Sequence, residues 1–157
     1  MPLHTHPLTE SEARSVCTWR YPAPYDAYDL PAWEDVVRLG WGIGEAAIRR
    51  SQFFALCMDG RLIGWFRLKP CSGYVSLGVG LAPDQCGHGL GQDAMRLVLT
   101  EAAAQYAGLP LRLEGRPFTR RALRCYEHAG FQELGRCRAD APDRPTELFL
   151  MEYRAGC

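Results

Sequence analysis

Residues 74–115 read YVSLGVGLAPDQCGHGLGQDAMRLVLTEAAAQYAGLPLRLEG, and this stretch decides the fold. It predicts a strand over 74–81, a glycine-rich turn, a helix over 89–107 and a strand over 111–115. The helix is indicated by apolar residues at i, i+4, i+7, i+8 and i+12, which give it one hydrophobic face. A strand, a helix and a strand in this order form a crossover, so the two strands are expected to be parallel.

The residues before this stretch predict short helices and then a meander. Residues 9–12 (TESE) have the form of a capping box, so a helix is expected over about 10–20. Residues 31–50 predict two short helical pieces, because three glycines interrupt them. Asp59-Gly60 joins two apolar runs and is the strongest short hairpin signal, and a second turn at 71–73 leads into strand 74–81.

The residues after it predict a helix that Thr119 opens and Gly130 ends, followed by strands over 131–138 and 146–153. The expected order is helices, three-stranded meander, helix, strand, helix and two strands. This order is typical of a mixed α/β fold of the α+β type. With 157 residues, the chain is expected to form a single domain over residues 1–157.

Composition excludes several classes of protein. Apolar residues make up 47% and charged residues 23%, which excludes disorder over most of the chain. Eighteen basic and 18 acidic residues give zero net charge, so we expect neither nucleic acid nor an anionic membrane as a partner. No apolar run approaches the roughly 18 residues that a membrane span needs. Residues 1–10 lack the apolar region of a signal peptide, and a cytoplasmic location is expected.

The cysteines and histidines predict no metal site and no disulfide framework. The seven cysteines are odd in number and irregularly spaced, without a CxxC pair, so we expect reduced thiols. His4 and His6 are interpreted as residues of a plain strand rather than as metal ligands.

The glycine turn over residues 86–91 (CGHGLG) suits the binding of an anion. Glycines let the backbone approach a ligand, and the helix that follows begins with unpaired N–H groups and a positive dipole end. The turn lacks the lysine of a P-loop, and its GxGxG spacing differs from that of a dinucleotide-binding fold. A tight turn without any ligand is the alternative interpretation.

Two segments resemble motifs of the GNAT N-acetyltransferase superfamily. Residues 79–95 resemble its acetyl-CoA-binding segment, [RQ]-x-x-G-x-[GA], with Cys86 at the Arg/Gln position and Gly89 and Gly91 at the small positions. Residues 122–131 resemble its A-x-x-x-Y-E-x-x-G-F segment, with Thr119 in place of the usual Asn. The opening, with WRYPAPYD, is similar to a bacterial subgroup of the superfamily in which WRYPxPYD recurs.

The resemblance implies a mostly antiparallel sheet with a central, splayed parallel strand pair, flanked by helices. It also implies acetyl-CoA as co-substrate, without a metal. Backbone groups near Val79 and Leu81 would bind the pantetheine arm, and amides over residues 86–92 would hold the pyrophosphate. The expected cofactor-binding residues are Val79, Leu81, Cys86, Gly87, His88, Gly89, Leu90, Gly91, Gln92 and Thr119.

The resemblance also implies Tyr126 as the general acid that protonates the departing CoA thiolate, and a phenol near pKa 10 can serve a thiol near 8.5. The alternative is that Tyr126 only packs its ring on the inner face of its helix. A general base is harder to assign, because strand 74–81 has no acidic residue and Ser76 stands where an acid is expected. Glu114 is the nearest candidate. Its alternative role is a solvated strand residue paired with Arg112 by alternation.

The acceptor is expected to be a small-molecule or peptide amine. Trp19, Tyr21, Tyr25 and Tyr28 are interleaved with acidic residues, which suits a cationic amine and equally suits an aromatic core edge. The main hypothesis is an N-acetyltransferase that moves an acetyl group from acetyl-CoA to a primary amine by direct attack. The alternative is a non-catalytic acyl-CoA-binding or regulatory protein of the same fold. A homodimer is compatible with either.

Overall fold

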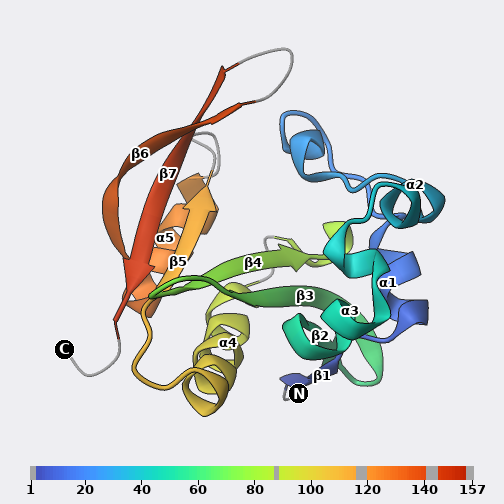
Figure 1. Cartoon of the computed structure of the whole chain (residues 1–157), viewed down its shortest axis with the longest axis horizontal. Helices are drawn as coiled ribbons and strands as arrows, with labels where there is room; N and C mark the ends of the chain where they lie inside the picture. Colours follow the sequence, from blue (N-terminus) through green and yellow to red (C-terminus); the bar gives the residue numbers. More distant parts are fainter. Residues whose placement is uncertain (1–2, 87–88, 116–119, 141–144, 155–157) are drawn as a thin grey trace. The chain divides into compact units, whose positions relative to one another are not determined.

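The computed structural model describes residues 3–86, 89–115, 120–140 and 145–154. Its strands form a seven-stranded sheet of order β1-β2-β3-β4-β5-β7-β6, mostly antiparallel, with one parallel pair, β4 and β5 (Figure 1). The strands are β1 (Leu3–Pro7), β2 (Phe53–Met58), β3 (Arg61–Pro70), β4 (Val75–Leu81), β5 (Leu111–Gly115), β6 (Gln132–Asp140) and β7 (Pro145–Tyr153). The helices are α1 (Glu10–Val16), α2 (Trp33–Arg38), α3 (Ala46–Gln52), α4 (Gly91–Gln105) and α5 (Arg120–Ala129), with short 3₁₀ turns η1 (Tyr25–Tyr28), η2 (Gly42–Gly44) and η3 (Pro83–Gln85).

The expected mixed α/β fold with its parallel pair is confirmed, but the predicted order omitted the first strand. The chain divides into two compact units, Met1–Leu68 with Gly78–Leu90, and Lys69–Leu77 with Gly91–Cys157. The single domain expected from the length stays a prediction. Within the described residues, no helix is both long and apolar enough to span a membrane.

After β1, the first unit continues with α1, a helix whose start is fixed by its capping box. The Thr9 side chain accepts from the Glu12 N–H, and the Glu12 carboxylate accepts from the Thr9 N–H, as the sequence predicted. The helix ends at Val16 rather than near residue 20. Beyond it, the Thr18 hydroxyl donates to the Ser15 carbonyl and so satisfies one of the open carbonyls of the last turn.

The glycines over 40–44 divide the next helical stretch as predicted. Gly40 has a φ of +75°, which ends α2, and η2 then leads into α3. A hydrophobic core lies between these helices and the strands of the first unit. Its buried members are Leu8, Ala13, Val16, Cys17, Val36, Ile43, Phe53, Ala55 and Cys57.

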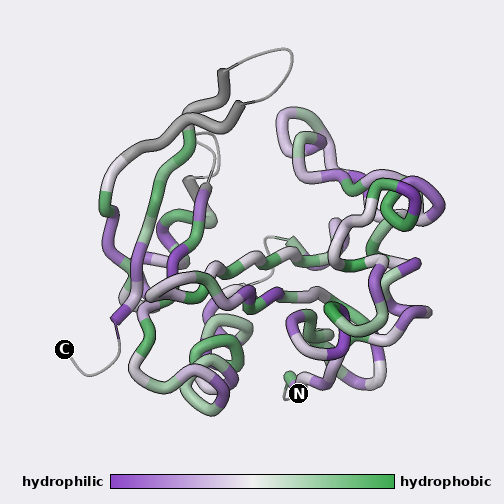
Figure 2. The backbone as a smooth tube through the Cα atoms, viewed as in Figure 1, coloured by the Kyte–Doolittle hydropathy of each residue, from purple (hydrophilic) through white to green (hydrophobic). Residues whose placement is uncertain are grey.

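The β2–β3 hairpin turns at Asp59-Gly60, where both residues have positive φ (55° and 75°). This pair of angles is the left-handed geometry of a tight hairpin turn, which Asp-Gly favours. Along the second half of β3, hydrophobic and hydrophilic residues alternate, as the colouring of Figure 2 shows. The alternation buries Phe66 and Leu68, whereas Arg67 between them is half-buried and Lys69 is exposed.

The end of β4 requires a glycine because of Trp65. A Cβ added at Gly80 would lie 2.5 Å from Trp65 Nε1 and 3.0 Å from Cε2, well inside van der Waals contact. A Cβ at Gly78, two residues earlier on the same strand, would meet the same ring at an ordinary 3.7 Å. Gly80 therefore lets the indole lie directly against the backbone.

We expect Gly80→Ala to lower the free energy of unfolding by about 1–3 kcal/mol, because the stiff indole ring must move. Gly78→Ala is the matched control and should change it by less than about 0.5 kcal/mol. Denaturant unfolding followed by circular dichroism measures both. Equal effects of the two substitutions would contradict the role given to Trp65.

The second unit contains the start of β4, the strands β5, β7 and β6, and the helices α4 and α5. The parallel ladder between β4 and β5 holds two described pairs, Val75–Leu111 and Ser76–Arg112, at the beginning of each strand. Apolar residues of α4 and of these strands are buried, including Val75, Leu77, Ala94, Met95, Val98, Leu111, Leu113 and Met151. The crossover predicted from residues 74–115 is thus present.

Candidate active site

The glycine turn after β4 has a backbone conformation that needs glycine. Gly89 has a φ of +76°, and a Cβ added there would meet no atom within 4 Å. The glycine is therefore required by backbone conformation rather than by crowding, and one side of the turn is open to a ligand. The exposed Cys86 thiol lies 3.5 Å from the Ala82 carbonyl oxygen, to which it donates. Gly87 and His88, also expected to bind cofactor, lie outside the described residues, as does Thr119.

The carbonyl at the end of β4 already has a partner. The Tyr21 hydroxyl donates to the Leu81 oxygen at 2.6 Å, and the Tyr21 N–H donates to Asp29 Oδ1 at 3.0 Å. Burial, with the neighbouring Cys86 and Asp29, raises the pKa of Tyr21, so its phenol stays neutral. The Cys86 thiol also lies 3.9 Å from the Leu81 oxygen, so this carbonyl has two donors beside it.

The four aromatic residues expected to bind the acceptor differ in their surroundings. Trp19 packs against the core of the first unit, and Tyr21 is the residue bonded to Leu81. Tyr25 and Tyr28 lie in η1, and each is 40% exposed. The core-edge interpretation therefore fits Trp19, whereas Tyr25 and Tyr28 are partly exposed at the surface.

In the second unit, the N-terminus of α4 packs closely on α5. A Cβ at Gly91 would lie 2.8 Å from Cys125 Sγ, and the Gln92 side-chain amide donates to the Cys125 carbonyl oxygen at 3.1 Å. Gly91 thus has a packing reason to be glycine in addition to any role in binding. Burial raises the pKa of the Cys125 thiol, which acts here as a small apolar side chain.

Tyr126, on α5, is half-buried, and its ring packs against Phe131 with ring centroids 6.0 Å apart. Phe131 in turn packs on Tyr153 at 5.5 Å, and its N–H donates to the Tyr126 carbonyl at 2.9 Å. The ring thus packs within the second unit, and the choice between a role in packing alone and a role as general acid stays a prediction.

A polar hollow of about 190 Å³ opens on the second unit. Alternation along each strand brings its polar side chains to one face, and the Ser76–Arg112 register sets the two strands beside each other. The hollow is lined by Tyr74, Ser76, Arg112, Glu114 and Leu150. Glu114, the predicted base, therefore shares a hollow with Ser76, the residue that stands at the position expected for an acid. Leu150 also lines the hollow, and no local sequence signal predicted this.

The partner of Arg112 differs from the expected one. Alternation had suggested an Arg112–Glu114 pair, but Arg112 Nε donates to Glu152 Oε2 at 2.8 Å. Arg112 and Glu152 are direct cross-strand neighbours in the β5–β7 ladder. The guanidinium also lies 4.6 Å from the centre of the Tyr74 ring. Arg112 therefore interacts with Glu152 and with the Tyr74 ring. The carboxylate of Glu114 is exposed in the hollow.

The Glu152 carboxylate is buried, with its side chain 6% exposed, and it accepts hydrogen bonds from Arg112 and Arg154. These bonds lower the pKa of Glu152 despite its burial. A carboxyl group whose pKa is lower in the folded than in the unfolded state stabilises the fold above the unfolded pKa. That stabilisation is lost as pH falls through the folded pKa.

We expect Glu152→Gln to reduce the free energy of unfolding at neutral pH by about 1 kcal/mol, because both guanidinium groups are partly solvated and can turn to water. The deficit relative to the wild type should shrink as pH is lowered below about 4.5. Denaturant unfolding of both proteins over a pH series measures this. A deficit that stays constant down to acidic pH would contradict the lowered pKa.

Comparison with models of known protein families finds one match to this chain. The sequence model described as "Acetyltransferase (GNAT) family" matches residues 13–131, a range that includes the glycine turn, Glu114 and Tyr126. The chain belongs to the acetyltransferase (GNAT) family. It is therefore an acyltransferase, as the two motifs predicted. A comparison with curated protein sequences gives no match.

Solved structures of the same fold agree with the GNAT architecture. A spermidine N-acetyltransferase SpeG chimera from Vibrio cholerae and hSSAT is 16% identical, with a TM-score of 0.78 over 98% of this chain and 96% of that chain. The enzyme AAC(6')-Ib, in complex with paromomycin and acetyl-CoA, is 18% identical, with a TM-score of 0.75 over 99% and 94%. A GNAT-family acetyltransferase from Bacillus anthracis is 13% identical, with a TM-score of 0.77 over 98% and 95%. At these identities the likeness concerns the fold.

Proposed function

We propose that this acyltransferase moves an acetyl group from acetyl-CoA to a primary amine by direct attack. The observation that carries the proposal is the family match over residues 13–131, which includes both segments whose motifs imply this chemistry. A structure of the same fold, AAC(6')-Ib, holds acetyl-CoA, which supports a CoA thioester as the acetyl donor.

The segment from Val79 to Gln92 would hold the co-substrate. The end of β4 offers backbone groups at Val79 and Leu81, and the open turn at Gly89 lets a pyrophosphate approach the amides over residues 86–92. Cys86 supplies no charge to that contact, where the family motif has Arg or Gln. Backbone amides do not depend on this side chain, so the expected cost is weaker binding rather than its loss.

Two residues of this chain would accept and donate the protons of the reaction. A neutral amine nitrogen forms the new C–N bond as the C–S bond of the thioester breaks. Glu114, directly or through water, takes the proton that the attacking nitrogen loses, and Tyr126 donates a proton to the departing sulfur. A backbone N–H near Val79 would stabilise the oxyanion that develops on the carbonyl oxygen.

The acceptor that this chemistry fits is a cationic amine. Tyr25 and Tyr28 are exposed in η1 beside the exposed carboxylate of Asp26, and an aromatic face with a carboxylate attracts an ammonium group. The names of the compared structures include a spermidine N-acetyltransferase and an enzyme bound to the aminoglycoside paromomycin. Polyamines and aminoglycosides are therefore the first acceptors to test. The WRYPxPYD subgroup, the cytoplasmic location and the homodimer stay predictions.

Two measurements test the proposal. Acetyl-CoA should raise the melting temperature of the protein, whereas NAD should not, because the turn lacks the spacing of a dinucleotide site. Release of the CoA thiol should then depend on an added amine, in a panel of polyamines, aminoglycosides, amino acids and peptide N-termini. Acetyl-CoA binding without thiol release for any amine would instead favour the non-catalytic alternative.

A further inference from the structure

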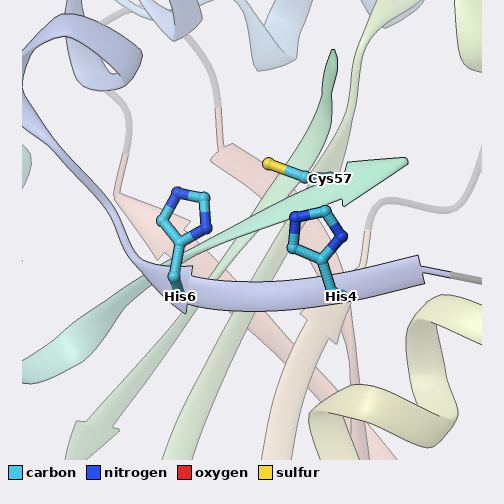
Figure 3. A group of neighbouring side chains, drawn as sticks. All are labelled: His4, His6 and Cys57. Carbon is cyan, nitrogen blue, oxygen red and sulfur yellow. The ribbon is translucent and has the colours of Figure 1, made fainter. Parts of the chain in front are cut away.

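A group of side chains that the proposed acetyl transfer does not use lies at the N-terminal edge of the sheet. The ligand-capable atoms of His4, His6 and Cys57 all lie within 4.8 Å of one another. Figure 3 shows the two imidazole rings side by side on β1, with the sulfur of Cys57 above the space between them. Two imidazoles and a thiol are a donor set typical of zinc.

Strand geometry brings these three residues together. His4 and His6 alternate along β1 and so share one face of the strand. In the antiparallel β1–β2 ladder, His4 is the direct partner of Cys57, which places the thiol on the same face. The ring centroids of the two histidines are 6.1 Å apart. The backbone thus presents three donors on one side of an edge strand.

Glu12, on α1, adds a carboxylate that contacts both His6 and Cys57. Its two oxygens lie 2.9 and 3.0 Å from His6 Nε2, and Cys57 Sγ lies 3.8 Å from Glu12 Oε2. When Nε2–H donates to this carboxylate, the other ring nitrogen, Nδ1, carries the free lone pair. Metal-binding histidines usually have such an outer carboxylate, which fixes the tautomer and the ring orientation.

The capping box holds Glu12 in place for this contact. The same carboxylate accepts the Thr9 N–H, so its position is set by the start of α1. Glu12 is therefore an acceptor whose carboxylate is oriented by contacts from both Thr9 and His6.

We propose that His4, His6 and Cys57 bind a zinc ion, with Glu12 orienting His6 and a water molecule in the fourth position. Zinc bonds of about 2.0 Å to nitrogen and 2.3 Å to sulfur place tetrahedral ligand atoms about 3.3–3.6 Å apart. The three donors need to draw together by only about 1 Å. The exposed ring of His4 can make most of this movement by rotation.

The donor set also distinguishes zinc from other common cations. Ca²⁺ and Mg²⁺ prefer sets made only of oxygen ligands, which this face lacks. Because the thiolate is the form that binds the ion, the Cys57 thiol would release its proton to solvent when the ion binds. The bound ion would tie the edge strand β1 to β2 and, through Glu12, to α1.

The test uses untagged full-length protein, because a histidine tag would itself bind the ion. Titration calorimetry should find one Zn²⁺ per chain. Zn²⁺ at about 100 times its dissociation constant should raise the melting temperature by roughly 5–10 °C. Co²⁺ in place of Zn²⁺ should give the intense visible bands of a tetrahedral site and a near-ultraviolet thiolate charge-transfer band.

Three variants and two matched controls locate the ion. His4→Ala removes an exposed ligand, so it should leave the metal-free fold unchanged. It should weaken Zn²⁺ binding by more than the roughly 10- to 100-fold expected of Glu12→Gln, which keeps the capping box but loses the charge. Cys57→Ser should abolish the thiolate band. His128→Ala and Cys71→Ser change an exposed histidine and a half-buried cysteine elsewhere and should leave binding unaffected.

The outcomes separate this site from the proposed acetyl transfer, because all readouts are made without acetyl-CoA. Absence of 1:1 Zn²⁺ binding, or binding that His4→Ala leaves intact, would overturn the proposal. If Cys57→Ser does not fold, the circular dichroism of the metal-free variant will reveal this. The effect of His4→Ala on Zn²⁺ binding then decides whether the site exists.

Discussion

Replacing Tyr126 by Phe should lower kcat for acetyl transfer by about 10²- to 10⁴-fold, the usual contribution of a positioned general acid. The proposal gives the Tyr126 phenol the task of protonating the CoA thiolate as the C–S bond breaks. A Phe side chain keeps the ring that packs on Phe131 at 6.0 Å and removes only the hydroxyl. The helix and its packing should therefore survive, and the loss should fall on the chemical step.

The measurement is CoA thiol release under saturating amine and acetyl-CoA, with the KM for acetyl-CoA followed in parallel. Tyr153→Phe is the matched control, because the Tyr153 ring packs on the same Phe131 and the substitution likewise removes only a phenol hydroxyl. That control should keep kcat within about twofold of the wild type, a difference of less than about 0.5 kcal/mol. Unchanged kcat in Tyr126→Phe would mean that Tyr126 acts through packing alone.

Local sequence signals predicted the elements that surround the candidate site. The capping box at Thr9 and the hairpin at Asp59-Gly60 form as expected, because each is decided by residues within four positions of one another. The turn at Gly89 and the crossover through α4 follow from glycine conformation and from a single amphipathic face. Physical chemistry over short stretches of chain was sufficient for these features.

Contacts between distant residues could not be predicted in the same way. Alternation says that Arg112 and Glu114 share a face, but it does not say which strand lies alongside them. The structure places Glu152, 40 residues later, opposite Arg112. The hydrogen bond from Tyr21 to Leu81 spans 60 residues and likewise leaves no local signature. Both contacts depend on strand order and on loop paths.

The omission of the first strand has a similar cause and a direct consequence. His4 and His6 were interpreted as strand residues, but residues 3–7 (LHTHP) are too short a segment to predict a partner strand, and the predicted element order left the strand out. Taken by themselves, His4 and His6 therefore had no assigned neighbours. Pairing with β2 places Cys57 opposite His4, and this register creates the donor cluster.

The pairing of Arg112 with Glu152 also sharpens the assignment of the base. Had Arg112 bound Glu114, the carboxylate would have been neutralised by its strand neighbour and held away from substrate. With Arg112 on Glu152 and over the Tyr74 ring, Glu114 lies exposed in a hollow that it shares with Ser76. An exposed carboxylate beside hydroxyl groups can take a proton directly or through a water molecule.

Glu114→Gln should therefore lower kcat by about 100-fold, because the amide has nearly the same shape and cannot accept the proton. The split between kinetic constants separates this role from simple attraction of a cationic acceptor, which would raise the KM for the amine and leave kcat unchanged. The kcat deficit should persist as pH rises toward the pKa of the amine, near 10 for an alkylammonium, because a neutral acceptor still loses a proton after it attacks.

Glu133→Gln is the control for Glu114→Gln, because it makes the same change at an exposed glutamate on β6 and should leave both constants unchanged. If Glu114→Gln keeps the wild-type kcat at neutral pH, the proton must leave through water without this carboxylate. If Glu114→Gln does lower kcat, Ser76→Asp is informative as a second substitution, since it places an acid on β4 in the same hollow. A gain in kcat from Ser76→Asp only in the Glu114→Gln background would show that either strand can supply the base.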